Sequence, residues 1–120
     1  MLRQSLIRRL ARFSRCRVLI VGDVMLDEYM WGTVSRISPE APVPVVAVRS
    51  ESLKVGGAAN VAANVSALGG QAALIGLVGD DAAAERLSQE LELAGVRSDG
   101  LIVDRTRPTT LKSRVVAGSQ

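Results

Sequence analysis

Short apolar runs along the chain alternate with longer stretches in which apolar residues return every three or four positions. The first run, Val18-Leu19-Ile20-Val21, is rich in β-branched residues and ends at a glycine, which is typical of a strand buried on both faces of a parallel sheet. Similar runs predict further strands at 74–78, 101–103 and 109–117.

Helices are predicted in two of the intervals between these strands. The first, from about 58 to 68, ends at the pair Gly69-Gly70. The second, from 82 to 94, follows an acidic N-cap in Gly79-Asp80-Asp81 and ends at Gly95. Strands and helices therefore alternate, which favours right-handed crossovers and an α/β fold with a mainly parallel sheet flanked by helices.

The stretch from Thr33 to Val48 has a different pattern. Pro39, Pro42 and Pro44 interrupt extended, valine-rich sequence. Because proline cannot donate a ladder hydrogen bond, central strands are not expected here. We expect edge strands that project from the main sheet.

The first seventeen residues carry most of the excess positive charge. The formal net charge is +3, and this segment holds six arginines, Arg3, Arg8, Arg9, Arg12, Arg15 and Arg17. Its apolar residues fall near helical spacing, at Leu2, Leu6, Ile7, Leu10 and Phe13. A nucleic-acid arm, a membrane-surface helix and a transit peptide stay open, but we favour an amphipathic helix that packs beside the first strand and needs no partner.

Several classes of protein are disfavoured by composition. No run approaches membrane-spanning length, so we expect a cytoplasmic protein without a membrane partner. The aromatic residues Phe13, Tyr29 and Trp31 are not interleaved with cations, which argues against nucleic-acid binding. Cys16 is the single cysteine and histidine is absent, which excludes internal disulfides, zinc sites and histidine-based catalysis within this sequence. No metal site is expected.

Two acids follow the first predicted strand. Asp23 and Asp27 come after its carboxyl end, where open α/β sheets bind ligands. A carboxylate there can accept hydrogen bonds from two sugar hydroxyls. Helix caps or turn acids would give the same spacing, and the two interpretations are evenly balanced.

A glycine pair opens the first predicted helix. Gly56 and Gly57, followed by small residues and Asn60, let a ligand approach the backbone, and the helix N-terminus favours an oxygen-rich group. Asn60 could add a donor and an acceptor to one hydroxyl. The spacing matches neither a P-loop nor a dinucleotide fingerprint, and tight helix packing is the alternative explanation.

Two cations share one face of the last predicted strand. Lys112 and Arg114 are two positions apart, so their side chains project to the same side. Adjacent cations repel unless an anion lies between them, which makes a phosphate site a reasonable hypothesis. A solvated edge strand explains the pattern equally well.

Taken together, these motifs resemble the ribokinase (PfkB) family of sugar kinases, most closely its heptose 7-phosphate kinases, over about residues 18 to 117. The matching segments are residues 22–27, 31–32, 36–45, 56–62 and 107–112. The resemblance implies a ribokinase-like α/β fold with a small projecting β lid at about 33–48, of which residues 1–120 would form the N-terminal part of the domain.

The resemblance also implies an activity. Such kinases transfer the γ-phosphoryl group of ATP to the anomeric hydroxyl of D-glycero-D-manno-heptose 7-phosphate, toward the heptose of lipopolysaccharide. It implies substrate-binding roles for Asp27, Gly56, Gly57, Asn60, Lys112 and Arg114, and lid positions for Arg36, Ser38, Pro39 and Glu40. Lys112 and Arg114 are the candidates for the phosphate of the substrate.

Catalysis is expected to depend on residues outside this sequence. No segment matches the Gly-Ala-Gly-Asp motif that supplies the family's catalytic base, and ATP and Mg²⁺ are expected to bind mainly downstream. A homodimer through the β lid is expected. Two alternatives stay open, namely a non-catalytic sugar-binding or dimerisation module and a kinase of the same family for another sugar.

Overall fold

The computed structural model describes residues 2–119. Its helices are α1 (Leu2–Leu10), the short 3₁₀ helix η1 (Phe13–Arg15), α2 (Ala58–Ala67) and α3 (Ala82–Leu93). Its strands are β1 (Arg17–Val21), β2 (Val24–Ile37), β3 (Pro44–Gly57), β4 (Gln71–Val78), β5 (Leu101–Val103) and β6 (Leu111–Ser119). The strands and helices predicted from the apolar pattern are all present, with boundaries shifted by a few residues.

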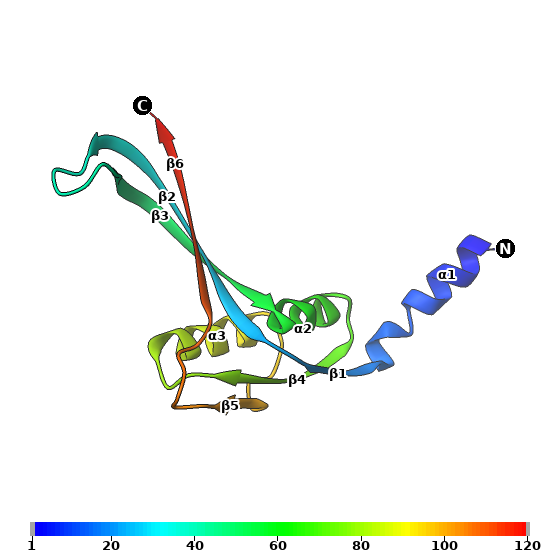
Figure 1. Ribbon diagram of the computed structural model, residues 1–120. Helices are drawn as coiled ribbons and strands as arrows, with labels where there is room; N and C mark the ends of the chain where they lie inside the picture. The colour runs from blue at the N-terminus through cyan, green and yellow to red at the C-terminus, as the bar shows by residue number, and fades with distance from the viewer. Residues whose placement is uncertain (1, 120) are drawn as a thin grey trace.

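The strands form two sheets. In the first sheet the order is β1-β4-β5 and both pairings are parallel. In the second the order is β3-β2-β6, with β3 antiparallel and β6 parallel to β2. Figure 1 shows the second sheet extending away from the part that holds α2 and α3. Three of the four pairings within residues 2–119 are therefore parallel, and the predicted mainly parallel α/β class is confirmed.

The core lies on one face of the first sheet. Ile20, Leu74 and Val78 are buried together with Leu87 and Leu91 of α3. Period-2 alternation sends neighbouring residues to opposite faces, so β4 buries every second residue from Leu74 to Val78, and β1 buries Ile20. Both helices lie on the same side of these strands (Figure 1).

The prediction that β1 is buried on both faces is wrong for the described residues. Leu19 and Val21 are 62% and 68% exposed, because α2 and α3 cover only the opposite face. The apolar side chains of β4 on the same open face are also uncovered, as in Leu77 at 44%.

The predicted helix boundaries are confirmed in detail. Gly69 and Gly95 adopt positive φ angles of 88° and 73°, the left-handed conformation that ends a helix at low steric cost for glycine. The side chain of Asp81 caps α3, since its Oδ1 accepts a hydrogen bond from the Ala84 backbone N–H at 2.9 Å.

The projecting hairpin is longer than its sequence suggests. β2 and β3 are fourteen residues long and pair over their whole length apart from two irregularities, so residues 33–48 are only the distal half of the hairpin. Pro39 and Pro42 lie in the connecting loop and Pro44 is the first residue of β3, where a missing N–H interrupts no central ladder. β6 pairs with the outer edge of β2, beginning next to Asp27. It therefore belongs to this second sheet and not to the sheet formed by β1, β4 and β5.

The basic helix α1 does not pack beside β1, contrary to expectation. Leu6, Ile7 and Leu10 are 54–58% exposed. The turn formed by η1 directs α1 away from the rest of the structure, as Figure 1 shows at the N-terminus. None of the helices within residues 2–119 is both long and apolar enough to cross a membrane.

Candidate sugar-binding site

Asp27 stands in the middle of the second sheet. On β2 it is paired with Lys54 of β3 on one side and with Lys112 of β6 on the other. Its side chain is only 17% exposed. Asp23 lies between β1 and β2, separated from β1 by Gly22, whereas Asp27 lies four residues further along, within the β2 strand.

Lys112 compensates the charge of Asp27. The Lys112 Nζ atom lies 2.8 Å from Asp27 Oδ1. Oδ1 is nevertheless buried without an aligned hydrogen-bond donor, so the contact is an ion pair that lacks good hydrogen-bond geometry. Because Oδ1 is buried, a ligand hydroxyl would have to reach this carboxylate through its other oxygen, Oδ2.

Gly56 makes room for this carboxylate. A Cβ atom at position 56 would lie 2.7 Å from both Asp27 Oδ2 and Met25 Cγ. Any larger residue would therefore displace Asp27 or Met25. The structure thus supplies a steric reason for glycine here.

Gly57 connects β3 to α2 and needs glycine for a different reason. Its φ angle is 58°, and a Cβ atom there would collide with the carbonyl oxygen of Asp23. The same carbonyl accepts a hydrogen bond from the Ala58 N–H at 2.8 Å. Because no side chain caps α2, its first turn is left open to an oxygen-rich ligand.

Asp27 and Asn60 meet in one groove of about 500 Å³. Asn60 lies in the first turn of α2, and the far wall comes from the end of α3. The other lining residues are Tyr29, Leu53, Lys54, Val55, Glu90, Leu93 and Ala94. Two residues that lie far apart in the sequence and were both expected to bind sugar are thus brought together.

Lys112 and Arg114 lie on the same face of β6, as alternation predicts. The Arg114 guanidinium is 5.5 Å from the centre of the Tyr29 ring, and Tyr29 is its direct partner on β2. Both cations therefore lie on the face of the sheet that borders the groove. Lys112 contacts Asp27, and Arg114 contacts the Tyr29 ring.

The four lid residues lie far from this groove. Arg36 is near the end of β2, and Ser38, Pro39 and Glu40 form the loop at the tip. The Ser38 hydroxyl oxygen accepts a hydrogen bond from the Glu40 N–H at 3.2 Å. Ser38 lies eleven positions after Asp27, roughly 36 Å along an extended strand. Their role as a lid remains a prediction.

Sequence reasoning did not single out Lys54, Tyr29 or Glu90. Alternation from Asp27 along β2 and from Gly56 along β3 could have placed Tyr29 and Lys54 on the groove face. Glu90 has no comparable local signal, because its position depends on how α3 packs against β3.

A hydrogen-bonded connection fixes the start of β6. Asp81 Oδ2 accepts from the Thr109 N–H at 2.8 Å, and the buried Thr109 hydroxyl oxygen accepts from the Gly79 N–H at 2.8 Å. The Thr109 N–H, followed by its hydroxyl and by the Ala84 N–H, holds the pKa of Asp81 below its ordinary value. This connection ties the turn before α3 to the strand that carries Lys112.

The sequence of this chain matches that of a known protein family. Residues 16–120 match the family described as pfkB family carbohydrate kinase. The chain belongs to the pfkB family.

Two curated relatives of this pfkB family chain are similar over most of it. The D-beta-D-heptose 7-phosphate kinase of Bordetella bronchiseptica is 56% identical over 109 residues, which are 91% of this chain and 34% of that protein. The bifunctional protein HldE of Desulfatibacillum aliphaticivorans is 51% identical over 108 residues, 90% of this chain and 22% of that protein. The chain thus spans about a fifth to a third of the length of these relatives.

A solved structure shows the same fold. An uncharacterized sugar kinase from Pyrococcus horikoshii, in complex with ATP, aligns with a TM-score of 0.59 and 29% identity over 83% of this chain and 30% of that one. The predicted ribokinase-like α/β fold is confirmed.

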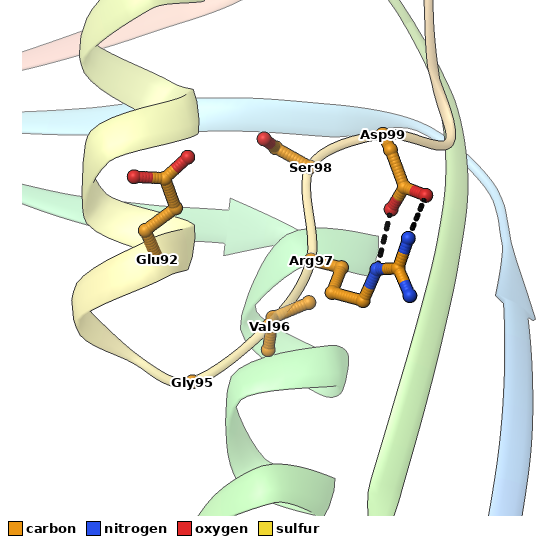
Figure 2. A pocket seen from close by; sticks show the side chains of 6 residues that line it. All are labelled: Glu92, Gly95, Val96, Arg97, Ser98 and Asp99. Atoms are coloured by element: carbon orange, nitrogen blue, oxygen red, sulfur yellow. Dashed lines mark hydrogen bonds and ion pairs between the residues drawn. The ribbon is translucent and has the colours of Figure 1, made fainter.

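A second pocket of this pfkB family chain has fewer polar groups available to a ligand than the groove at Asp27. It has a volume of about 360 Å³ and lies after α3 (Figure 2). Its cation, Arg97, donates two hydrogen bonds to Asp99, at 3.1 and 2.6 Å. These bonds keep the pKa of Asp99 below its ordinary value. Because Arg97 and Asp99 satisfy each other in solvent, no ligand group is needed there.

The described residues form no cluster of three metal ligands. In the span 2–119, no three carboxylate, cysteine or histidine side chains converge on one point. We therefore assign no step to the metal in this part of the protein.

Proposed function

We propose that this chain is the sugar-binding part of a kinase that transfers the γ-phosphoryl group of ATP to the anomeric hydroxyl of D-glycero-D-manno-heptose 7-phosphate. The family match, the relative named as a heptose 7-phosphate kinase and the ATP complex of a related sugar kinase support this reaction.

The observation that carries the proposal is the groove shared by Asp27 and Asn60. Asp27 offers a carboxylate that is 17% exposed and paired with Lys112, and Asn60 offers both a donor and an acceptor. Sugar hydroxyls can satisfy both groups, and hydrogen bonds to a charged acceptor are stronger than neutral ones. In this proposal these residues bind and orient the sugar, and Lys112 and Arg114 at the margin of the groove bind its phosphate.

The remaining catalytic groups are proposed to lie outside residues 1–120. Phosphoryl transfer depends on positioning and on stabilising charge around the transferred group. We propose that the catalytic base, the ATP site and the Mg²⁺ site come from the larger part of the protein that the longer relatives contain. Asp23 is not the base in this proposal, because the family's base belongs to a Gly-Ala-Gly-Asp motif that this sequence does not contain.

The hairpin is proposed to act as the lid and as a homodimer contact. Its distal half exposes apolar side chains, including Ile37 at 61% and Val43 at 52%. An exposed apolar surface on a projecting sheet is suited to pairing with a second copy of the chain.

The deciding experiment is ATP turnover with heptose 7-phosphate, measured on the protein at full gene length and on residues 1–120. We expect turnover by the full-length protein alone. Full-length protein that phosphorylates another sugar, such as fructose or ribose, in place of heptose 7-phosphate would contradict the proposed substrate. Full-length protein that binds heptose 7-phosphate without any ATP turnover would instead support the non-catalytic binding module.

A further inference from the structure

Two rows of side chains cross the second sheet on the groove side. One row runs from Lys54 through Asp27 to Lys112, and the next pairs Tyr29 with Arg114. Lys54 and Arg114 reach the Tyr29 ring from the two strands that flank it, at 5.8 and 5.5 Å from its centre, so their charged ends are at most about 11 Å apart. The surface therefore gathers three cations around a single strand.

The charges on this surface do not balance. Lys112 is paired with Asp27, whereas neither Lys54 nor Arg114 forms an ion pair with any residue of the described part of the chain. Glu90 lines the same groove from α3 without forming an ion pair with Lys54. Two cations are thus held over a neutral ring, where a cation–π contact contributes only about 0.5–1 kcal/mol at an exposed site.

The Tyr29 ring is fixed from a third direction. The Trp31 ring stacks on it with 5.8 Å between centroids and an angle of 16° between planes. Arg114 also reaches the Tyr29 hydroxyl at 3.5 Å, the long limit of a hydrogen bond. A stacked ring keeps the two cations near each other without neutralising either one.

We propose that Lys54 is a third phosphate-binding residue of this site, which acts with Arg114 across the Tyr29 ring and sets the preference for a phosphorylated over an unphosphorylated sugar. The inference rests on the sugar kinase function proposed above.

The charge of the ligand fits this arrangement. A phosphate monoester carries close to two negative charges at neutral pH, with three acceptor oxygens. Three cations against the carboxylates of Asp27 and Glu90 leave an excess of one positive charge around the groove. Lys54 is the member of the three that also lines the groove with Asp27 and Asn60, so it can reach a phosphate at the end of a sugar bound there.

The test is calorimetric binding to the full-length protein, with D-glycero-D-manno-heptose 7-phosphate and the unphosphorylated heptose as the two ligands. We expect Lys54→Gln to weaken binding of the phosphorylated sugar on the order of tenfold to a hundredfold, the range for one charged hydrogen bond. Binding of the unphosphorylated sugar should stay within about twofold, since Lys54 is proposed to contact only the phosphate.

Three further variants separate this role from a structural one. Lys54→Arg keeps the charge and should restore most of the affinity. Tyr29→Phe keeps the aromatic face and should bind nearly as well as the natural protein, whereas Tyr29→Leu should not. The matched control is Arg105→Gln, which removes an exposed cation paired with Asp80 and should change neither affinity.

The outcomes for the inference and for the proposed function differ. An equal loss for both sugars in Lys54→Gln, or no loss for either, overturns the role of Lys54 even if the full-length protein is an active heptose 7-phosphate kinase. A selective loss in a protein without ATP turnover supports Lys54 as a phosphate ligand and rejects the kinase function alone.

Discussion

The backbone N–H of Thr109 donates to the carboxylate of Asp81 at 2.8 Å, across 28 positions of sequence. Through this bond the cap of α3 is also the anchor of β6. The two residues therefore link the stability of the helix to the placement of Lys112 and Arg114, and substitutions at either one can be expected to affect both.

Asp81 should make the protein less stable in acid. Its folded pKa lies below its ordinary value of 3.8, so its contribution is present above that value and is lost as the pH falls through the lowered folded pKa. Urea unfolding measured from pH 6 to pH 2 should show a shallower loss of stability in Asp81→Asn. A residual slope is expected from Asp99 and Asp104, whose pKa values are also lowered, and an unchanged slope would contradict the assignment.

Thr109→Val should destabilise the fold by about 1–3 kcal/mol, because it leaves the Gly79 N–H without its acceptor in a buried position. Chemical denaturation gives the measurement. Thr109→Ser, which keeps the hydroxyl, is the control and should lose distinctly less. Equal losses in the two variants would show that the hydroxyl contributes no more than the methyl group and would contradict this assignment.

Gly56→Ala should impair sugar binding more than folding. The added Cβ would press on Asp27 Oδ2 and Met25 Cγ, and a displacement of the carboxylate by part of an ångström can weaken substrate binding on the order of tenfold. The KM of the full-length protein for heptose 7-phosphate is the readout. Gly118→Ala, where the new atom would meet nothing within 4 Å, should leave the KM unchanged. A normal KM in Gly56→Ala would contradict the predicted displacement of the Asp27 carboxylate.

Asp27→Asn and Lys112→Met should differ in their dependence on the substrate phosphate. Loss of the Asp27 charge should weaken heptose and heptose 7-phosphate binding alike, by about tenfold or more, because both sugars carry the hydroxyls it accepts from. Loss of Lys112 should weaken heptose 7-phosphate more. Calorimetry with both sugars on each variant tests this, and an equal effect of Lys112→Met on the two would remove Lys112 from the phosphate site.

Local patterns were sufficient to predict most of the elements and part of the site. The caps at Asp81 and Gly95 and the shared face of Lys112 and Arg114 follow from helix and strand geometry that acts over a few residues. The grouping of Asp27, Gly56 and Asn60 was predicted from their resemblance to family motifs, and the groove places Asp27 beside Asn60.

Features set by tertiary contacts were not predicted. Lys112 can pair with Asp27, and Arg114 can contact the Tyr29 ring, only because β6 joins the hairpin. The alternation along β6 fits either sheet equally well, so it does not predict this choice. The exposed face of β1 and the isolated α1 were missed for a related reason. An apolar run such as 18–21 shows that burial is favourable, but it does not show which other segment provides the cover.

The site is also built from parts of the chain that are made at different times. The Ser113 hydroxyl on β6 donates to Glu28 on β2, and 85 residues separate these two positions. At ribosomal rates of about 5–20 residues per second, Asp27 would wait roughly 4–17 s after its own synthesis before β6 follows. During that interval β2 and β3 can pair with each other but the outer edge of β2 is open, so the newly made hairpin is the segment most in need of protection from pairing with another chain.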